Sequence, residues 1–140
     1  MYLLDTNLVS EFRKLGTGKA DSFVEKWAQQ VLPEHMYVSV ITFQELEIGI
    51  LLMERRDAQQ GQVLRHWFED RVIPAFKGRV LPVDERVART CAKLHVPDPR
   101  PFRDTLIAAT AIIHGLTIAT RNVADFQLPG VGVINPWLAA

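Results

Sequence analysis

The sequence predicts an α/β fold in which a central parallel sheet has helices on both faces. Short apolar runs alternate with longer segments of helical periodicity, which is the pattern of repeated strand–helix–strand units. Capping and turn residues separate the two kinds of segment. No repeat, low-complexity tract or linker-like stretch interrupts the 140 residues. We therefore expect a single domain over residues 1–140.

Five short runs are expected to form the strands. Because helical segments separate the first four of them along the chain, we expect a parallel sheet, with the carboxyl ends of its strands at one edge. The predicted strands span residues 2–5, 36–40, 79–81, 117–120 and 131–134.

Six segments are expected to be helical, because their apolar residues recur at helical spacing. Asp21 and Asp84 are suitable N-caps, and Gly115 is a suitable C-cap. Three prolines in residues 96–101 require a loop there. The predicted helices span residues 7–14, 22–31, 42–55, 59–75, 85–95 and 102–114.

Composition and charge describe a globular protein. Acidic and basic residues number 16 each, so the formal net charge is zero, which counts against broad electrostatic binding of nucleic acid. The sequence shows no signal peptide or long apolar span, which predicts a cytoplasmic location without a membrane. The single cysteine, Cys91, excludes an internal disulfide and is expected to be a small buried hydrophobe.

Polar residues far apart in the chain lie where this fold would bring them to one edge of the sheet. Asp5 ends the first strand, while Glu45 and Asp104 lie in the first turns of two helices. Asn122 and Asp125 follow the fourth strand. Carboxylates gathered in this way repel one another unless a cation compensates, and hard oxygen ligands suit Mg²⁺ or Mn²⁺. We expect a divalent-metal site that activates water for phosphodiester hydrolysis.

Each of these residues also has a purely structural explanation. Asp5 could cap the following helix, and Asp104 could favour the dipole of its own helix. Glu45 follows Thr42 by three residues, which is the spacing of a capping box. The polar residues after the fourth strand could form turn hydrogen bonds. The predicted convergence of these residues is therefore stronger evidence of a metal site than any one residue alone.

Other catalytic chemistries lack their motifs. No glycine-rich nucleotide-binding sequence is present, and no serine lies in a nucleophile elbow. The four histidines lack the spacing of a zinc site.

Four fragments, in this order, span nearly the whole chain: Leu4-Asp5-Thr6-Asn7, Glu45-Leu46-x-x-Gly49, Asp104-x-x-Ile107-Ala108-Ala109-Thr110-Ala111 and Thr120-Arg121-Asn122-x-x-Asp125-Phe126. These fragments resemble the motifs of PIN-domain proteins, close to the VapC and FitB toxins of bacterial toxin–antitoxin pairs. The ending Asn135-Pro136-Trp137 also resembles the FitB-like branch. The resemblance implies a PIN-like, three-layer α/β/α domain around the central parallel sheet.

The resemblance also implies a ribonuclease centre that depends on Mg²⁺ or Mn²⁺. The positions that match the acidic core, and would hold the metal, are Asp5, Glu45 and Asp104. Thr6 and Thr120 match supporting hydroxyls that orient a carboxylate or a metal-bound water.

The fourth catalytic position departs from the family pattern. Many relatives carry an acid where this chain has Asn122, which brings an oxygen but no charge. Asp125 could supply a metal ligand in its place, and we expect one firmly bound ion, with a second recruited by substrate. The candidate phosphate contacts are Arg13, Arg103 and Arg121.

Family resemblance further implies a homodimer and a cognate antitoxin, similar to VapB or FitA, that blocks the acidic pocket. RNA would be the substrate, and operator DNA would be bound through the antitoxin in a larger assembly. The helices at 22–31 and 42–55 carry more apolar residues than one core-facing stripe requires, which suits an interface or burial within the monomer. These residues are Trp27, Ile48, Leu51 and Leu52.

Two alternative functions remain open on the sequence alone. One is a DNA-binding regulatory subunit of a FitAB-like complex with weak or no nuclease activity. The other is a metal-dependent DNA nuclease.

Overall fold

A parallel sheet of five strands forms the centre of the computed structural model, which describes residues 1–138. The strands are β1 (Tyr2–Leu4), β2 (Met36–Ser39), β3 (Val80–Leu81), β4 (Thr117–Ala119) and β5 (Val133–Ile134). Their order across the sheet is β3-β2-β1-β4-β5. The order therefore reverses between β1 and β4, and in parallel α/β sheets ligands bind at the carboxyl edge of such a reversal.

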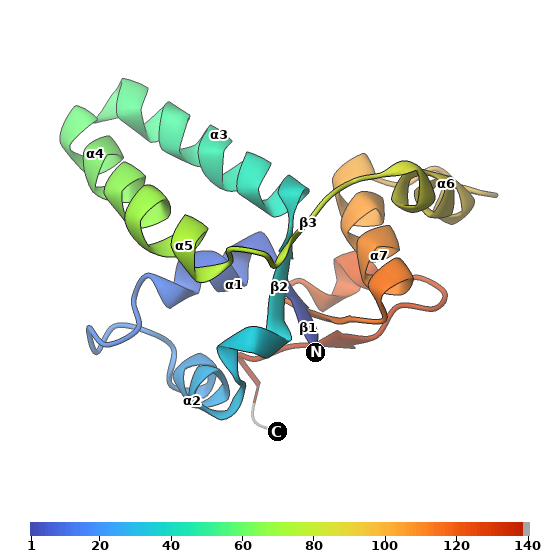
Figure 1. The fold of residues 1–140 in the computed structure, drawn as a ribbon, viewed down its shortest axis with the longest axis horizontal. Coiled ribbons are helices and arrows are strands. Elements are labelled where there is room, and N and C mark those ends of the chain that lie inside the picture. The colour runs from blue at the N-terminus through green and yellow to red at the C-terminus, as the bar shows by residue number, and fades with distance from the viewer. Residues whose placement is uncertain (139–140) are drawn as a thin grey trace.

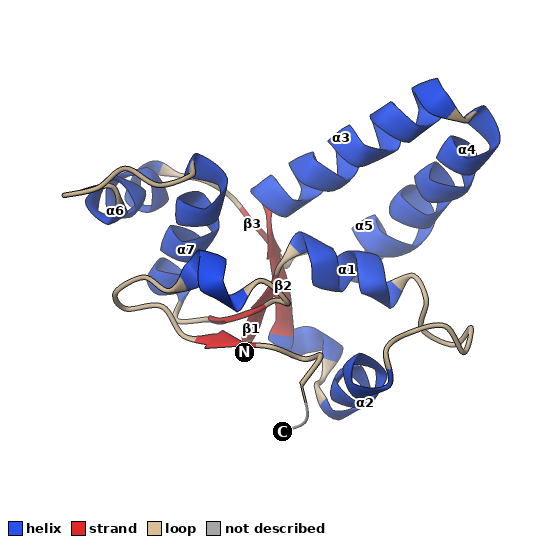
Figure 2. Cartoon of the chain, turned by 180° about the vertical axis from the view of Figure 1, so that it is seen from behind, coloured by secondary structure: helices blue, strands red, loops and turns tan. Residues whose placement is uncertain are grey.

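Helices cover both faces of the sheet. They are α1 (Thr6–Phe12), α2 (Ser22–Gln30), α3 (Val40–Arg56), α4 (Ala58–Trp67), α5 (Ile73–Ala75), α6 (Glu85–Leu94) and α7 (Phe102–His114). Figure 1 shows α1 to α5 on one side of the strands and α6 and α7 on the other. The view from behind shows the same division (Figure 2). The predicted three-layer α/β/α architecture is confirmed.

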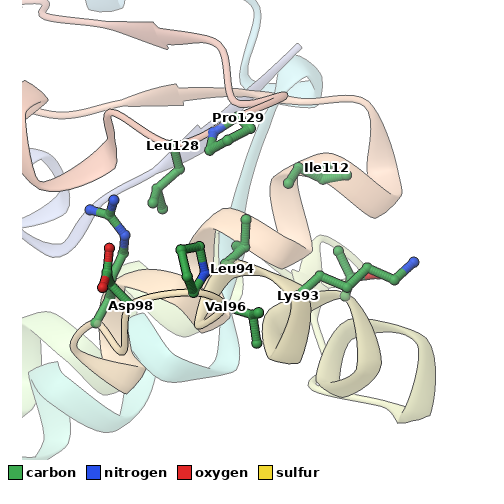
Figure 3. Close-up of a pocket in the computed structure, with 10 residues that line it drawn as sticks. Lys93, Leu94, Val96, Asp98, Ile112, Leu128 and Pro129 are labelled. Carbon is green, nitrogen blue, oxygen red and sulfur yellow. The ribbon is translucent and has the colours of Figure 1, made fainter.

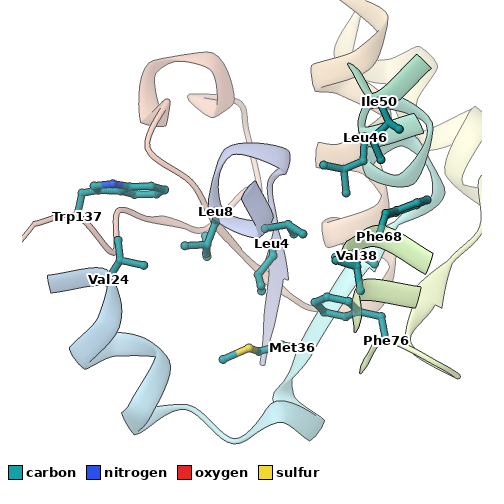
Figure 4. Close-up of a cluster of buried hydrophobic side chains, with 13 residues drawn as sticks. Leu4, Leu8, Val24, Met36, Val38, Leu46, Ile50, Phe68, Phe76 and Trp137 are labelled. Carbon is teal, nitrogen blue, oxygen red and sulfur yellow. The ribbon is translucent and has the colours of Figure 1, made fainter. Parts of the chain in front are cut away.

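Alternate side chains of β1 enter two separate cores. Leu4 packs with residues of α1 and β2, including Leu8 and Val38, in the core on the side of α1 to α5 (Figure 4). Leu3 points to the opposite face and packs with Ile107 of α7. This alternation follows from the two-residue period of a strand, and it explains why so short a strand is apolar throughout.

Helix α3 begins earlier than the sequence predicts, and the capping box proposed for Thr42 and Glu45 is wrong. The N-cap is Ser39, the last residue of β2, whose hydroxyl accepts a hydrogen bond from the backbone N–H of Ile41 at 3.0 Å. Thr42 is buried, and within residues 1–138 its hydroxyl is the buried side-chain atom that lacks a hydrogen-bond partner. Because the strand continues directly into the helix, no turn residue marked this boundary in the sequence.

The predicted helix 59–75 is not uniform. Regular α4 is followed by a π-helical segment, Phe68–Val72, and then by the single turn of α5. Pro74 has no N–H and its ring excludes a carbonyl one turn earlier, so a regular α-helix cannot continue through it. The three predicted caps are confirmed: Asp21 and Asp84 cap α2 and α6, and Gly115 ends α7 with a φ of 65°.

No helix within residues 1–138 is long and apolar enough to span a bilayer.

Gly61 allows α4 to lie directly against α3. A Cβ atom at Gly61 would lie 2.5 Å from the Cα atom of Glu54, whereas one at Gly49 would have no neighbour within 4 Å. We expect Gly61→Ala to lower the free energy of unfolding by about 1–3 kcal/mol, because the helices must separate. Gly49→Ala should be neutral or stabilising, by up to about 1 kcal/mol. Urea unfolding of both variants checks this, and equal stabilities would contradict the close packing of the helices.

Candidate functional site

The carboxylate of Asp5 lies at the end of β1 and is fully buried. One oxygen accepts the backbone N–H of Thr6 at 2.8 Å and a guanidinium N–H of Arg103. The other accepts the hydroxyl of Thr120 at 2.7 Å and the side-chain amide of Asn7 at 3.4 Å. Four donors therefore compensate for burying this carboxylate, and they fix its orientation.

Thr120, at the end of β4, connects the two strands that flank the reversal. While its hydroxyl donates to Asp5, its oxygen accepts the backbone N–H of Asn122 at 3.0 Å. The amide of Asn7 also donates to this oxygen at 3.3 Å, and its carbonyl accepts the backbone N–H of Arg121 at 3.3 Å. The expected supporting hydroxyl is thus placed to orient Asp5.

Asn7 belongs to this network, and the sequence reasoning did not assign it to the site. The available signal was its position two residues after Asp5, in the first turn of α1. That position reaches across to the end of β4 only because β1 and β4 are adjacent in the sheet.

Glu45 reaches the site from the second turn of α3, not from the first turn as predicted. One of its carboxylate oxygens accepts the hydroxyl of Thr6 at 2.5 Å, and the other accepts Nε of Arg103. Its side chain is 29% exposed. The hydroxyl of Thr6 therefore orients the carboxylate that α3 supplies.

A single guanidinium joins the three acids. Arg103, in the first turn of α7, donates from Nη2 to Asp5, from Nη1 to Asp104 at 2.6 Å, and from Nε to Glu45. Burial by itself lowers the pKa of Arg103, but the hydrogen bonds with Glu45 and Asp104 and the charges of Asp5 and Glu45 outweigh it. The net result is a raised pKa, so the group stays charged.

The environment of Asp104 raises its pKa. Burial raises the pKa of this carboxyl above its ordinary value, and the nearby charges of Asp125 and Asp5 add to the effect. The hydrogen bond and charge of Arg103 oppose the rise without cancelling it. As the pH falls, Asp104 is therefore protonated before an ordinary aspartate is.

The remaining candidates lie around this centre. Asn122 is exposed, and within residues 1–138 its side chain makes no hydrogen bond. Asp125 is also exposed, in the short 3₁₀ helix Val123–Phe126, near enough to Asp104 to influence its pKa. The guanidinium of Arg121 lies over the ring of Trp137, 5.0 Å from its centre.

A hollow of about 460 Å³ adjoins the acids between α1, α3 and α4. Its lining includes Glu45 and Thr6, the cationic residues Arg13 and Lys14, and Glu11, whose carboxylate forms a salt bridge with Lys14 at 3.3 Å. The structure therefore brings a predicted phosphate contact, Arg13, to the same hollow as a predicted metal ligand. A phosphate group drawn to Arg13 would lie close to Glu45.

A second hollow, of about 450 Å³, is shown in Figure 3, and its described lining includes none of Asp5, Glu45 and Asp104. It is bounded by the end of α6, the loop that follows it and the segment at Leu128 and Pro129. Among residues 1–138, the carboxylate that lines it is that of Asp98. Apolar residues such as Leu94 and Ile112 dominate it, so it lacks the groups that hydrolysis of a phosphodiester requires.

The three acids have the ligand chemistry that a divalent metal needs, but their carboxylates are not spaced to hold one. Asp5, Glu45 and Asp104 supply hard oxygen ligands, which Mg²⁺ and Mn²⁺ prefer. Within residues 1–138, however, no three acidic, histidine or cysteine side chains are close enough together to hold an ion. The carboxylates are spaced in this way because all three are paired with the guanidinium of Arg103.

Comparison with known proteins identifies the family. The model of the PIN domain matches residues 2–127. The chain belongs to the PIN-domain family. Toxin FitB of Neisseria gonorrhoeae is 38% identical, in an alignment covering 98% of this chain and 99% of FitB. VapC ribonuclease Y4jK of Sinorhizobium fredii is 35% identical, over 98% of both chains. The resemblance inferred from the sequence motifs is confirmed.

Solved structures agree with this assignment. The PIN fold of this chain matches FitAcB from Neisseria gonorrhoeae with a TM-score of 0.88 and 35% identity, over 99% of this chain and 100% of that chain. A structure of FitAB bound to an IR36 DNA fragment also gives 0.88, at 34% identity, over 100% of this chain and 98% of that chain.

In this PIN domain, Asp125→Asn should lower the pKa of Asp104, because it removes a nearby negative charge that disfavours ionisation. The pKa is measured by following the Asp104 carboxyl carbon by NMR as the pH is varied in metal-free buffer. Asp98→Asn is the matched control, since Asp98 is not among the groups that shift this pKa. An unchanged or raised pKa in Asp125→Asn would contradict the predicted proximity of the two acids.

Proposed function

We propose that this PIN domain is a metal-dependent endoribonuclease toxin that a cognate antitoxin inhibits. The observation that carries the proposal is the convergence of Asp5, Glu45 and Asp104 on one cationic point at the carboxyl edge of the sheet. Relatives named toxin FitB and VapC ribonuclease, similar over nearly the full chain, support the choice of RNA and of a toxin.

Asp5, Glu45 and Asp104 would hold the ion. When bound, Mg²⁺ or Mn²⁺ lowers the pKa of a coordinated water and stabilises negative charge on the phosphodiester. The protein's contribution is to keep the ligands oriented: Thr120 and the N–H of Thr6 fix Asp5, and the Thr6 hydroxyl fixes Glu45. Such positioning contributes strongly to metal affinity.

The cationic residues beside the acids would bring the RNA backbone to the centre. Arg13 and Lys14 line the hollow next to Glu45. Because Lys14 is paired with Glu11, Arg13 is the cation that we expect to attract a phosphate there, even in a protein of zero net charge. Asn122, at the fourth position, adds no charge, so Asp125 is the additional acid near the site. A single firmly bound ion suits this set of ligands better than a permanent pair.

Partners are proposed from the relatives and from an exposed apolar surface. FitAB has been solved bound to a DNA fragment, and we infer a FitA- or VapB-like antitoxin that carries this chain to operator DNA. Leu51 and Leu52 of α3, with Val63 of α4, are each at least half exposed. Exposed apolar side chains gathered on one helix pair suit a protein interface, here a homodimer.

Cleavage assays test the nuclease. We expect purified protein to cleave RNA with Mg²⁺ or Mn²⁺ but not with EDTA, and Asp5→Asn to reduce the rate at least about a hundredfold, because a metal ligand loses its charge. Asp98→Asn, which alters an acid remote from the centre, should retain the wild-type rate. Circular dichroism confirms that both variants fold.

Two outcomes would select the alternatives. Cleavage of DNA but not RNA would indicate a DNA nuclease. No cleavage of either nucleic acid, together with operator binding when the antitoxin is added, would indicate a regulatory subunit with an inactive centre. The second alternative is supported by Asn122, a neutral residue at the fourth position of the centre.

Leu52→Glu tests the proposed homodimer. Leu52 is 62% exposed in the single chain, so we expect the charge to leave folding intact while shifting the protein from dimer to monomer. Analytical ultracentrifugation measures the change, and thermal unfolding shows that the fold is kept. Val96→Glu, at an apolar residue that is 76% exposed in the loop after α6, is the matched control. A monomeric wild type, or a dimer unaffected by Leu52→Glu, would exclude this surface.

A further inference from the structure

The three acids of the centre already share a cation that belongs to the protein. Each of the three nitrogens of the Arg103 guanidinium donates to a different carboxylate. We propose that Arg103 occupies the place of the divalent ion in the metal-free centre and must leave before the ion can bind. The inference rests on the proposed metal-dependent function, and it names the residue that sets the affinity for metal.

The guanidinium and the ion compete for the same oxygens. Mg²⁺ requires carboxylate oxygens at about 2.0–2.1 Å from a single point. Around Arg103 the oxygens of Asp5, Glu45 and Asp104 are instead arranged about a planar fork, each opposite a different nitrogen. As a result, no set of these residues within 1–138 is spaced for a metal. Binding the ion requires the carboxylates to turn inward, and the guanidinium lies in the way.

The position of Arg103 on α7 shows that the carboxylates hold it there. Arg103 is the second residue of α7, and a cation at the N-terminus of a helix is disfavoured by the helix dipole. Burial of the guanidinium adds to the cost. Only its ion pairs with Asp5, Glu45 and Asp104 compensate for both effects.

The charge of the centre explains why a divalent ion would replace Arg103. One guanidinium against three carboxylates leaves an excess of two negative charges at the centre, before the nearby Asp125 is considered. A divalent ion in the same place compensates for more of that charge than Arg103 does. The side chain of Arg103 is 31% exposed, so it can turn outward without unfolding the helix. Its planar fork is then free to bind a phosphate, which is the contact that the sequence predicted for it.

Metal affinity measured without RNA tests the competition directly. By isothermal titration with Mn²⁺, Arg103→Gln should bind at least about tenfold more tightly than the wild type, because the competing state is removed. Arg100→Gln is the matched control: it removes the same charge three residues away, from an exposed side chain that makes no ion pair within residues 1–138. If both variants change the affinity equally, general electrostatics accounts for the effect and the proposal is wrong.

Thermal unfolding supplies a second measurement that does not depend on activity. Without metal, Arg103→Gln should unfold at a lower temperature than the wild type, because the three acids repel one another. Added Mg²⁺ should raise its unfolding temperature by more than it raises that of the wild type. If Arg103→Gln is unfolded without metal, refolding by Mg²⁺ supports the proposal, and failure of Mg²⁺ to restore the fold overturns it.

The two proposals fail in different ways. If neither the wild type nor Arg103→Gln binds Mn²⁺ or Mg²⁺, the metal-dependent function itself is overturned, and the competition with it. If the wild type binds metal and cleaves RNA but Arg103→Gln binds metal equally or more weakly, only the role of Arg103 is overturned.

Discussion

The main constraint on the site is that three carboxylates, which the fold places close together, repel one another and must be compensated. Asp5 is fully buried, and Glu45 and Asp104 share with it the same guanidinium. Such a cluster is stable only if hydrogen-bond donors and positive charge surround it. The protein supplies both, through backbone and side-chain donors on Asp5 and through Arg103. We infer that a catalytic ion would enter this arrangement by replacing one of its members.

The sheet explains why the acids meet. Strands β1 and β4 are adjacent and lie where the strand order reverses. Asp5 and Thr120 are therefore brought into hydrogen-bond contact although 115 positions separate them in the chain. Helices α3 and α7 then deliver Glu45 and Asp104 from opposite faces of the sheet (Figure 1). Each acid comes from a different element, so the geometry of the centre is sensitive to the packing of the whole domain.

The same packing divides the surface into regions with different proposed roles. The hollow beside Glu45 carries Arg13, with Lys14 paired to Glu11, and Arg13 suits contact with a phosphate backbone. The outer face of α3 and α4 carries exposed apolar side chains such as Leu52, which suits a protein partner. A substrate and a partner can therefore approach this chain over adjacent surfaces of one helical hairpin.

The sequence by itself determined the fold class and which acids meet at the carboxyl edge of the sheet, because strand and helix patterns and capping residues are local. Asp21, Asp84 and Gly115 marked helix ends correctly for this reason. It could not determine that Ser39, rather than Thr42, caps α3, because a strand that enters a helix without a turn leaves no local signal. Nor could it show that Asn7 joins β1 to β4, or that Arg103 lies among the acids. Those contacts connect residues distant in the chain, and only the packing of the sheet and helices decides which distant charges meet.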